Sequence, residues 1–453
     1  MSFPIQYHFQ RGQALPLGLV LLVAVAATVF FMFNSGQLVQ EKIRLTNTAD
    51  AVAYSAGVYE ARVLNYDAYT NRAIIANEIA IGQAVGLSSW AKYMGTSADT
   101  IGPYLQLIPY VGPYLKQLMD YIETIMDYVS LALSYVIPFH DAAIQALMLS
   151  QYAVHGPGNA VALFNRKQVM DEVAKRNDPD AKVDLIPLAD NFMGFTQRYE
   201  SQEERVRMGQ VVSDGRDAFL KSRNWGFGLV FACTGVKLEK RGSTELIDLT
   251  EGWKSMDTLS AHTYWIKWKW GIPSCKHSET PVGYGTAFSE DDLDDSDYSY
   301  AGSRSTNPNA SNKADSSEGI AGGYDPAPYS IGKGAIPAFH ELSENALKQS
   351  DPRTQITIRV TKSSVKQRYS GGSSVVKPSG SLDLYQGQHA NGQSASIARA
   401  EVFFERPDGA NPIFPGKAEK GSLFNPYWQV RLVPVSAADR ATAQLLQGGA
   451  LLP

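Results

Sequence analysis

The feature that most constrains this chain is an uncharged segment near its N-terminus, from Ala14 to Phe33. It reads ALPLGLVLLVAVAATVFFMF and contains no strongly polar side chain. A helix of this length spans about 30 Å, the thickness of the hydrocarbon core of a bilayer. The core helix of a soluble protein seldom runs so far without a polar face. The segment therefore predicts a transmembrane anchor with the lipid-facing residues Ala14, Leu19, Leu22, Val25, Phe30 and Phe33.

A cleaved signal peptide is the main alternative for this segment. The apolar run is longer than the usual signal-peptide core of about 7 to 15 residues, and no small-x-small cleavage pattern follows it. Instead, Asn34 to Tyr59 continues with apolar residues near helical spacing. We expect an anchor that leads directly into a helical stalk.

The orientation of the anchor does not follow from flanking charge. Arg11 precedes the apolar segment and Lys42 and Arg44 follow it, so the positive-inside rule does not decide between the two topologies. The leading tail is very short and the following region is large. This predicts a single-pass protein of the bacterial inner membrane, with a cytoplasmic N-terminus and the bulk of the chain periplasmic or extracellular.

The region that follows the anchor has two parts with different periodicity. Residues 35–223 are rich in alanine with short Gly/Pro breaks, which predicts a helical region. Within it, Tyr114 to Phe139 has apolar residues at period 3.6, and its charged residues argue against a second membrane span. Tyrosines recur through this block, and they either pack between helices or lie at lipid headgroup level.

Residues 224–453 show period two in several segments and predict an antiparallel β-rich domain outside the membrane. Within this domain, residues 289–333 are acidic and then rich in Ser, Asn and Gly, which predicts a long mobile loop. The expected fold class is α+β, with residues 1–34 as tail and transmembrane helix. The segments with alternating apolar residues are Tyr264 to Trp270, Gln355 to Thr361, Ala398 to Glu405 and Trp428 to Val435.

The first part of the chain carries a recognisable pattern. Arg11-Gly-Gln-Ala14 precedes the apolar helix, and Leu-x-Asn-x-Ala-Asp-Ala-x-Ala-x-x-Ala follows it from Leu45 to Ala56. This arrangement resembles the TadE/TadG-like proteins of tight-adherence (Flp) pilus assembly. The resemblance implies a membrane-anchored, pilin-like structural or assembly component whose partners are membrane lipid and other pilus proteins. If Gly12 were a prepilin cleavage site, Leu17 would stand where true prepilins have glutamate, so we expect the protein to keep its leader.

Small residues beyond the anchor suit close helix packing. Ala49, Val52, Ala53 and Ala56 lie on nearly one helical face. We expect this face to contact a helix of another protein or a second copy, giving a homo- or hetero-oligomer through the N-terminal helix.

Signatures of catalysis are missing from the sequence. No histidine has a metal-ligand spacing with a second His or Cys, and no phosphate-binding or hydrolase motif occurs. We expect no enzyme activity, no cofactor and no metal. A net charge of −4 gives no basic excess, which argues against nucleic acid as a partner. The acidic run at 290–297 lacks the glycine and glutamate of an EF-hand, which favours a solvated loop over weak calcium binding.

Two further features leave alternatives open. Cys233 and Cys275 form one disulfide if this region lies outside the cytoplasm, or they are two buried free thiols. The Trp-rich segment Tyr264 to Trp270 is either half of a sheet core, which its pattern favours, or an exposed binding platform. The platform supports the alternative function, a membrane-tethered protein that recognises carbohydrate or a protein partner.

Overall fold

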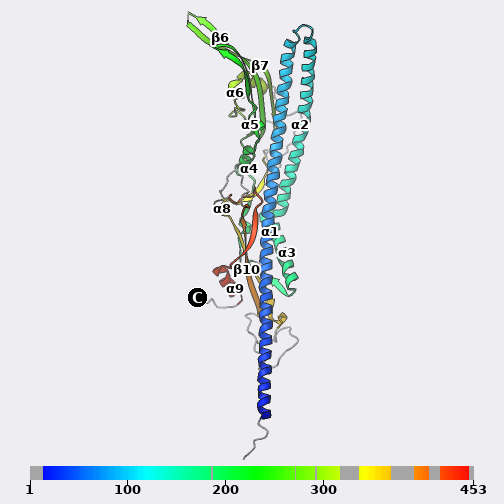
Figure 1. Ribbon diagram of the computed structural model, residues 1–453, viewed down its shortest axis with the longest axis vertical. Coiled ribbons are helices and arrows are strands. Elements are labelled where there is room, and N and C mark those ends of the chain that lie inside the picture. The colour runs from blue at the N-terminus through cyan, green and yellow to red at the C-terminus, as the bar shows by residue number, and fades with distance from the viewer. Residues whose placement is uncertain are drawn as a thin grey trace, which may run out of the picture.

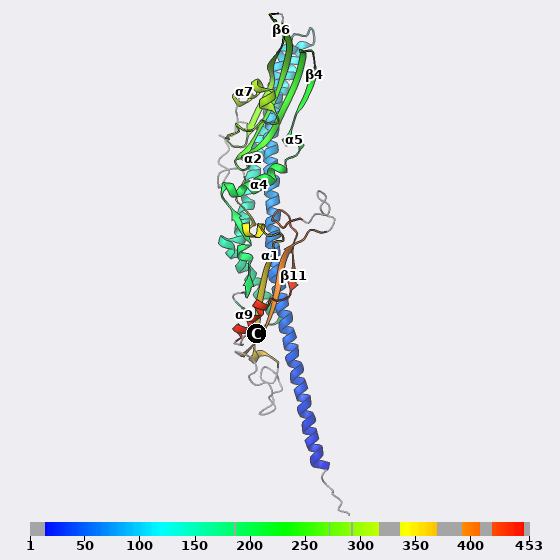
Figure 2. The same ribbon diagram turned by 90° about the vertical axis from the view of Figure 1, so that its left-hand side faces the viewer.

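The computed structural model describes residues 14–184, 187–270, 272–290, 293–316, 336–368, 392–407 and 419–447. It is an elongated molecule built along one long helix, α1 (Ala14–Leu105), which runs through most of its length (Figure 1). The other described elements lie beside the later part of α1, whereas its first turns extend alone (Figure 2). The leading residues Arg11 and Gly12 lie outside the described residues.

Helix α1 is continuous over 92 residues. At about 1.5 Å rise per residue its length is about 138 Å. Its two prolines, Pro16 and Pro103, lie in the first and last turns, and the missing donor of Pro16 costs least at a helix start. Burial begins only at Asn34, so the apolar segment and the packed spine are two parts of one helix.

Helix α2 (Gly112–His155) returns antiparallel along the distal part of α1. Ser88 of α1 is 2.6 Å from Ser130 of α2, and farther down the Tyr66 hydroxyl donates to Ser150 Oγ at 2.6 Å. Gly156, with φ +64°, ends α2 in a conformation that favours glycine. A short turn (η1, Pro157–Asn159) and α3 (Ala160–Asn177) follow.

A proximal sheet covers the part of α1 that follows the apolar segment. It has the antiparallel order β1-β9-β10-β11, with β2 also paired to β9. Gly57 of α1 faces Val430 and Ala400 so closely that a Cβ at position 57 would collide with Val430. The strands are β1 (Ala181–Val183), β2 (Ala189–Asp190), β9 (Thr354–Ser363), β10 (Gln393–Phe404) and β11 (Trp428–Val433).

A distal sheet lies against the far half of α1 and extends beyond it (Figure 1). Its four strands form an antiparallel meander in chain order. Trp253 is fully buried against Gly82 of α1, where an added Cβ would come within 2.9 Å of the indole ring. The strands are β4 (Trp225–Phe231), β5 (Thr234–Ile247), β6 (Gly252–Lys269) and β7 (Ile272–Phe288).

Short elements join these layers. A small sheet pairs β3 (Thr196–Tyr199) with β8 (Phe339–Leu342). Helix α4 (Gln202–Asp214) begins with a capping box in which Ser201 and Glu204 satisfy each other's backbone donors. The remaining helices and 3-10 turns are η2 (Phe192–Gly194), α5 (Ala218–Lys221), α6 (Ser303–Thr306), α7 (Pro308–Ser316), α8 (Glu344–Leu347), η4 (Ser364–Lys366) and α9 (Ala437–Leu446).

The expected α+β class is confirmed, but two expectations within it need correction. Residues 293–316 of the predicted mobile loop 289–333 include α6 and α7, and Ala310 and Ala314 are buried against the distal sheet. Residues 317–333 lie outside the described residues. The boundary between 35–223 and 224–453 is not a structural division, because β1 and β2 pair with β9 and α1 packs against both sheets.

Candidate functional site

The predicted anchor residues lie on the part of α1 that contacts no other described element. Leu19 and Leu22 are 61% and 68% exposed, and Val25 and Phe33 are also exposed, although Phe30 is partly shielded. Ala14 begins the helix. No residue is buried in the most apolar 18-residue window of α1. Such a helix is long and apolar enough to cross a bilayer, and its side chains have no protein core to enter.

A second helical stretch, Gly112–Asn177, also meets the length and hydropathy criteria for a membrane span. The position of this stretch along α1 argues against a second membrane span if the first part of α1 is the anchor. His140 Nδ1 of α2 is 2.7 Å from Asn77 Oδ1 of α1. Asn77 lies about 65 Å along the helix from Phe33, more than twice the thickness of a hydrocarbon core. The part of this stretch around His140 therefore cannot lie in the same bilayer as residues 14–33.

The small-residue face of α1 is occupied by the chain itself. Ala49, Val52, Ala53 and Ala56 are each 0% exposed. They form one core with α3 and with the inward residues of β9 and β10, among them Ile358. The expected contact with a partner helix at these positions is thus corrected, because the chain's own sheet fills the space.

Buried charges join α1 to elements that are distant in sequence. Arg166 of α3 pairs with Glu60 of α1 and with Asp190 of β2. Burial raises the pKa of Glu60 to about 7, although Arg166 opposes the shift. Nearer the membrane end, Lys362 of β9 pairs with Glu41 of α1 at 2.8 Å. Each pair fixes how a strand or helix docks on the spine.

The same face of α1 carries more polar residues in the core. Asp67 Oδ2 is 2.7 Å from His155 Nε2, and Asn71 Nδ2 donates to two backbone carbonyls. Glu78 accepts from Trp253 Nε1 at 3.2 Å. Glu60, Asp67, Asn71 and Glu78 follow one another at steps of seven, four and seven residues, which places them on one helical face. This polar face was not among the features predicted from the sequence.

The Asp67–His155 pair is the arrangement nearest to a catalytic dyad, but its geometry is structural. Both side chains are fully buried, and Asn159 Oδ1 engages His155 Nδ1 at 2.9 Å. Both ring nitrogens are therefore engaged, and His340 stacks on the ring with centroids 4.1 Å apart. Among the described residues no three His, Cys, Asp or Glu side chains form a group that could hold a metal ion. The pair stabilises the packing of α2 on α1.

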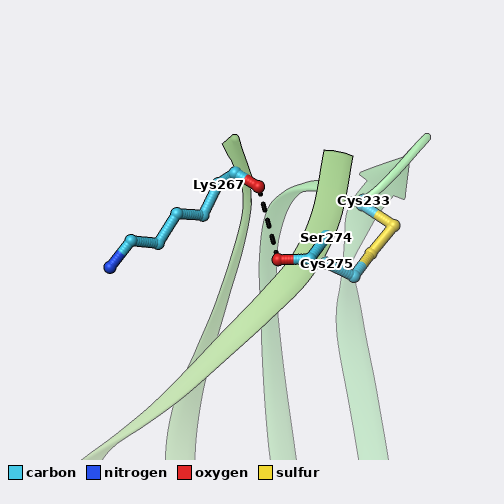
Figure 3. Close-up of a disulfide and its surroundings, with 4 residues drawn as sticks. All are labelled: Cys233, Lys267, Ser274 and Cys275. Carbon is cyan, nitrogen blue, oxygen red and sulfur yellow. Dashed lines mark hydrogen bonds between the residues drawn. A yellow bond between two sulfur atoms is a disulfide. The ribbon is translucent and has the colours of Figure 1, made fainter. Parts of the chain in front are cut away.

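Cys233 and Cys275 are joined by a disulfide in the distal sheet (Figure 3). Their Cα atoms are 5.5 Å apart, within the usual range for a disulfide. Cys233 lies in the β4–β5 turn, where Ala232 and Cys233 have φ of 44° and 62°, the positive values of a type I′ hairpin. Cys275 lies on β7 opposite Ile266. The disulfide therefore ties the β4–β5 hairpin to the β6–β7 hairpin.

The end of the distal sheet exposes large apolar side chains. We call this set the apolar tip, and each member is at least 67% exposed. Its members are Leu229, Phe231, Trp268, Trp270 and Ile272.

The favoured expectation of a sheet core for the Trp-rich segment is corrected at this end. The β6–β7 hairpin runs past the region where the sheet meets α1 (Figure 1). Exposed aromatic and aliphatic side chains gathered at one place are typical of a contact surface.

Comparison with known proteins gives one match. Residues 12–61 match the model of the Tad family, described as Flp pilus-assembly TadE/G-like. No curated protein and no solved structure matches the chain. The match covers the anchor and the first turns of the packed spine, including the buried small-residue face. The comparison therefore shows a similarity to TadE/G-like Flp pilus-assembly proteins that is confined to the N-terminal region of this chain.

Proposed function

We propose that the chain is a structural or assembly component of a Flp/Tad-type pilus system, a membrane-anchored minor pilin-like protein without enzyme activity. The observation that carries the proposal is the continuity of α1. One helix is both the TadE/G-like membrane segment and the spine on which both sheets pack. A rigid rod fixed at one end in lipid is suited to assembly work at a membrane surface.

The orientation in this proposal has the bulk of the chain outside the cytoplasm. The disulfide between Cys233 and Cys275 supports it, because disulfides persist in oxidising compartments and are rare in the cytoplasm. The distal sheet would then be exported, and the short leading tail would stay inside. Protease added to intact spheroplasts should digest the region beyond Asn34. Full protection of this region would reject the orientation.

The anchor can be tested with charges at its centre. Leu22→Arg combined with Val25→Arg should cost about 2.5 to 3.5 kcal/mol per charge in a bilayer. We expect the variant to be extracted from membranes by carbonate and to leave cells with few pili. Leu22→Ile with Val25→Leu is the matched control and should retain both properties. Normal pili with a soluble double-arginine variant would contradict the proposal.

A second candidate function rests on the apolar tip. It would make the chain a tethered binding protein that recognises a protein partner through Trp268, Phe231 and their neighbours. Aliphatic side chains beside the aromatics favour a protein surface over a sugar, because sugar sites combine flat rings with polar side chains. A photo-crosslinking residue at Trp268 should then trap a pilus component, whereas one at Trp225 at the base of β4 should not. Equal or absent trapping at both positions would contradict this candidate.

A further inference from the structure

The outward face of α2 carries a second set of exposed apolar side chains. We call it the α2 stripe. Its seven large members are each at least 51% exposed, and Ala132 between them is exposed as well. The large members are Tyr114, Leu118, Tyr121, Ile125, Tyr128, Tyr135 and Phe139.

The stripe points away from α1. The side of α2 that meets α1 is identified by Ser130, which contacts Ser88, and by Glu123 and Met126, which lie against Gly95. Lys116 also lies on that side, against Gly102. Leu118 is two residues from Lys116 and Ile125 is two residues from Glu123, which is about 200° around a helix. The tyrosines of the stripe are therefore not packed between α1 and α2, which was one of the two arrangements expected from the sequence. Helix α2 can therefore pack on α1 through one side and contact another molecule through the stripe at the same time.

The spacing of the stripe is that of a coiled-coil seam. From Tyr114 to Phe139 its eight positions follow one another at steps of 4, 3, 4, 3, 4, 3 and 4 residues. Tyrosine occupies every seventh position from 114 to 135. A sustained seven-residue repeat keeps one seam facing a partner helix along its whole length. An exposed seam with this spacing is suited to packing against a further helix.

The charges around the stripe are compatible with an identical partner. The residues that flank the seam are uncharged, whereas Lys116, Asp120, Glu123 and Asp127 occupy other sides of the helix. Two copies of α2 can therefore meet seam to seam without like charges opposed across the contact. The flanking residues are Leu115, Gln117, Ile122, Thr124, Val129, Leu131, Val136 and Pro138.

The position of α2 also fits a second copy. The stripe lies about 65 to 105 Å along the spine from Phe33, as the contacts of α2 with Asn77 and Gly102 show. Copies that are anchored in one membrane by the same segment hold their stripes at the same height above the membrane. Their α2 helices also run in the same direction relative to the membrane. Tethering also raises the effective concentration of one stripe for the other. This argument rests on the proposed anchor.

We propose that two copies of this chain associate side by side through their α2 stripes, as a parallel, in-register helix pair. In such a pair, equivalent seam residues of the two copies face each other. Leu118 of one copy would lie opposite Leu118 of the other, and Tyr128 opposite Tyr128. In an antiparallel pair, Leu118 would lie far from its equivalent.

Crosslinking of the full chain in its native membranes tests the geometry. Leu118→Cys and Tyr128→Cys should each give covalent dimers with a short bismaleimide. Asp120→Cys is the matched control, because it is exposed but lies about 130° from the centre of the stripe. Dimers at position 120 equal to those at 118 would overturn the proposal. Crosslinks from 118 and 128 to a different protein, without dimers, would also overturn it.

A charge exchange tests specificity and removes misfolding as an explanation. Ile125 is exposed, so Ile125→Glu and Ile125→Lys should not disturb the fold. Each variant alone should lower dimer crosslinking from Tyr128→Cys by about tenfold or more, since like charges meet in the seam. Co-expression of the two variants should restore it. Unchanged dimers in the single variants, or no rescue in the mixture, would refute the pairing. Dimers are measured separately from pili, so this result is independent of the proposed function.

Discussion

Ala53 shows how tightly one face of the spine is packed. It is 0% exposed and belongs to the core shared by α1, α3 and the proximal sheet. A longer side chain there would have to displace strand residues that are themselves buried. Its neighbours in the core cannot move aside into solvent. A larger side chain at position 53 would therefore lower the stability of the fold.

We therefore predict that Ala53→Leu lowers the free energy of unfolding by about 1 to 3 kcal/mol through overpacking. Denaturant unfolding of the full chain in detergent measures it. Ala76→Leu is the matched control, because Ala76 is an exposed alanine of the same helix and its enlargement should change stability by less than about 0.5 kcal/mol. Equal stability of the two variants would show that position 53 is not packed as described.

Glu78 makes the fold sensitive to pH. Burial raises the pKa of Glu78 from 4.5 to about 8, and nearby Asp141 adds to the shift, although the hydrogen bond from Trp253 opposes it. The folded chain therefore keeps a proton that the unfolded chain releases above about pH 4.5. The resulting stability is fully present below about pH 4.5 and is lost as the pH rises through about 8.

Glu78→Gln should flatten this dependence, because the amide oxygen still accepts from Trp253 and the side chain no longer titrates. Melting temperatures measured from pH 5 to 8 should fall less steeply in the variant than in the unaltered chain. Glu203→Gln, at an exposed position of α4, should keep the original slope. Parallel curves for Glu78→Gln and the unaltered chain would exclude Glu78 as the source.

Among the elements, the distal sheet depends most on a covalent link. Among the described elements, no helix lies against its free end (Figure 1), and the disulfide joins two hairpins across a sequence separation of 42 residues. Closing such a loop restricts the unfolded chain by about 4 kcal/mol in the chain-entropy model. Strands β5 to β7 pair along most of their length without it. The effect should therefore concentrate at the apolar tip.

We predict that Cys233→Ser with Cys275→Ser speeds hydrogen exchange and proteolysis around Phe231 and Trp268, while the core near Trp253 stays protected. Reductant added to the unaltered chain should have the same effect. Mass spectrometry of non-reduced peptides from exported protein should find the two cysteines linked. Two free thiols, or equal protection of the tip with and without the bond, would contradict the prediction.

An element could be predicted from the sequence where its own residues carry a pattern, but not where it depends on a partner far along the chain. Residues 14–33 and the strands β9 to β11 carry their own periodicity, so their type could be predicted. Strands β1 and β2 have three and two residues, too few to show an alternation, and their partner β9 lies far along the chain. The exposure of Trp268 was missed because period two does not reveal whether another layer covers a face.

The candidate site divides in the same way. The anchor follows from composition alone, and the two cysteines could be named as a pair because the chain has no others. Ala49 and Ala53 were expected to contact another helix because a small-residue face indicates close packing without indicating the partner. The charge pairs of Glu60 and Glu78 involve residues far away in sequence, and only the fold brings them together.

At the scale of the whole molecule, one helix sets the distance between lipid and apolar tip. Leu105 at the end of α1 lies about 108 Å along the helix from Phe33. Interior packing on both sheets keeps the helix from bending freely, since Trp253 and Val430 fit against glycines of the spine. The proximal sheet thus lies near the membrane, whereas the turn between α1 and α2 and the apolar tip lie far from it.

This geometry predicts very different energy transfer from two donor positions to acceptor dyes in the lipid headgroups. A donor on Gln40→Cys lies about 10 Å along the helix from Phe33 and should transfer efficiently. A donor on Leu107→Cys, in the exposed turn after α1, lies about 110 Å away, too far for measurable transfer. Both positions lie outside the cores, so neither change should disturb the fold. Strong transfer from position 107 would mean that the rod lies along the membrane or that α2 enters the membrane. Either result would remove the basis for the proposed contact between α2 stripes, which requires all copies to hold the stripe at the same height.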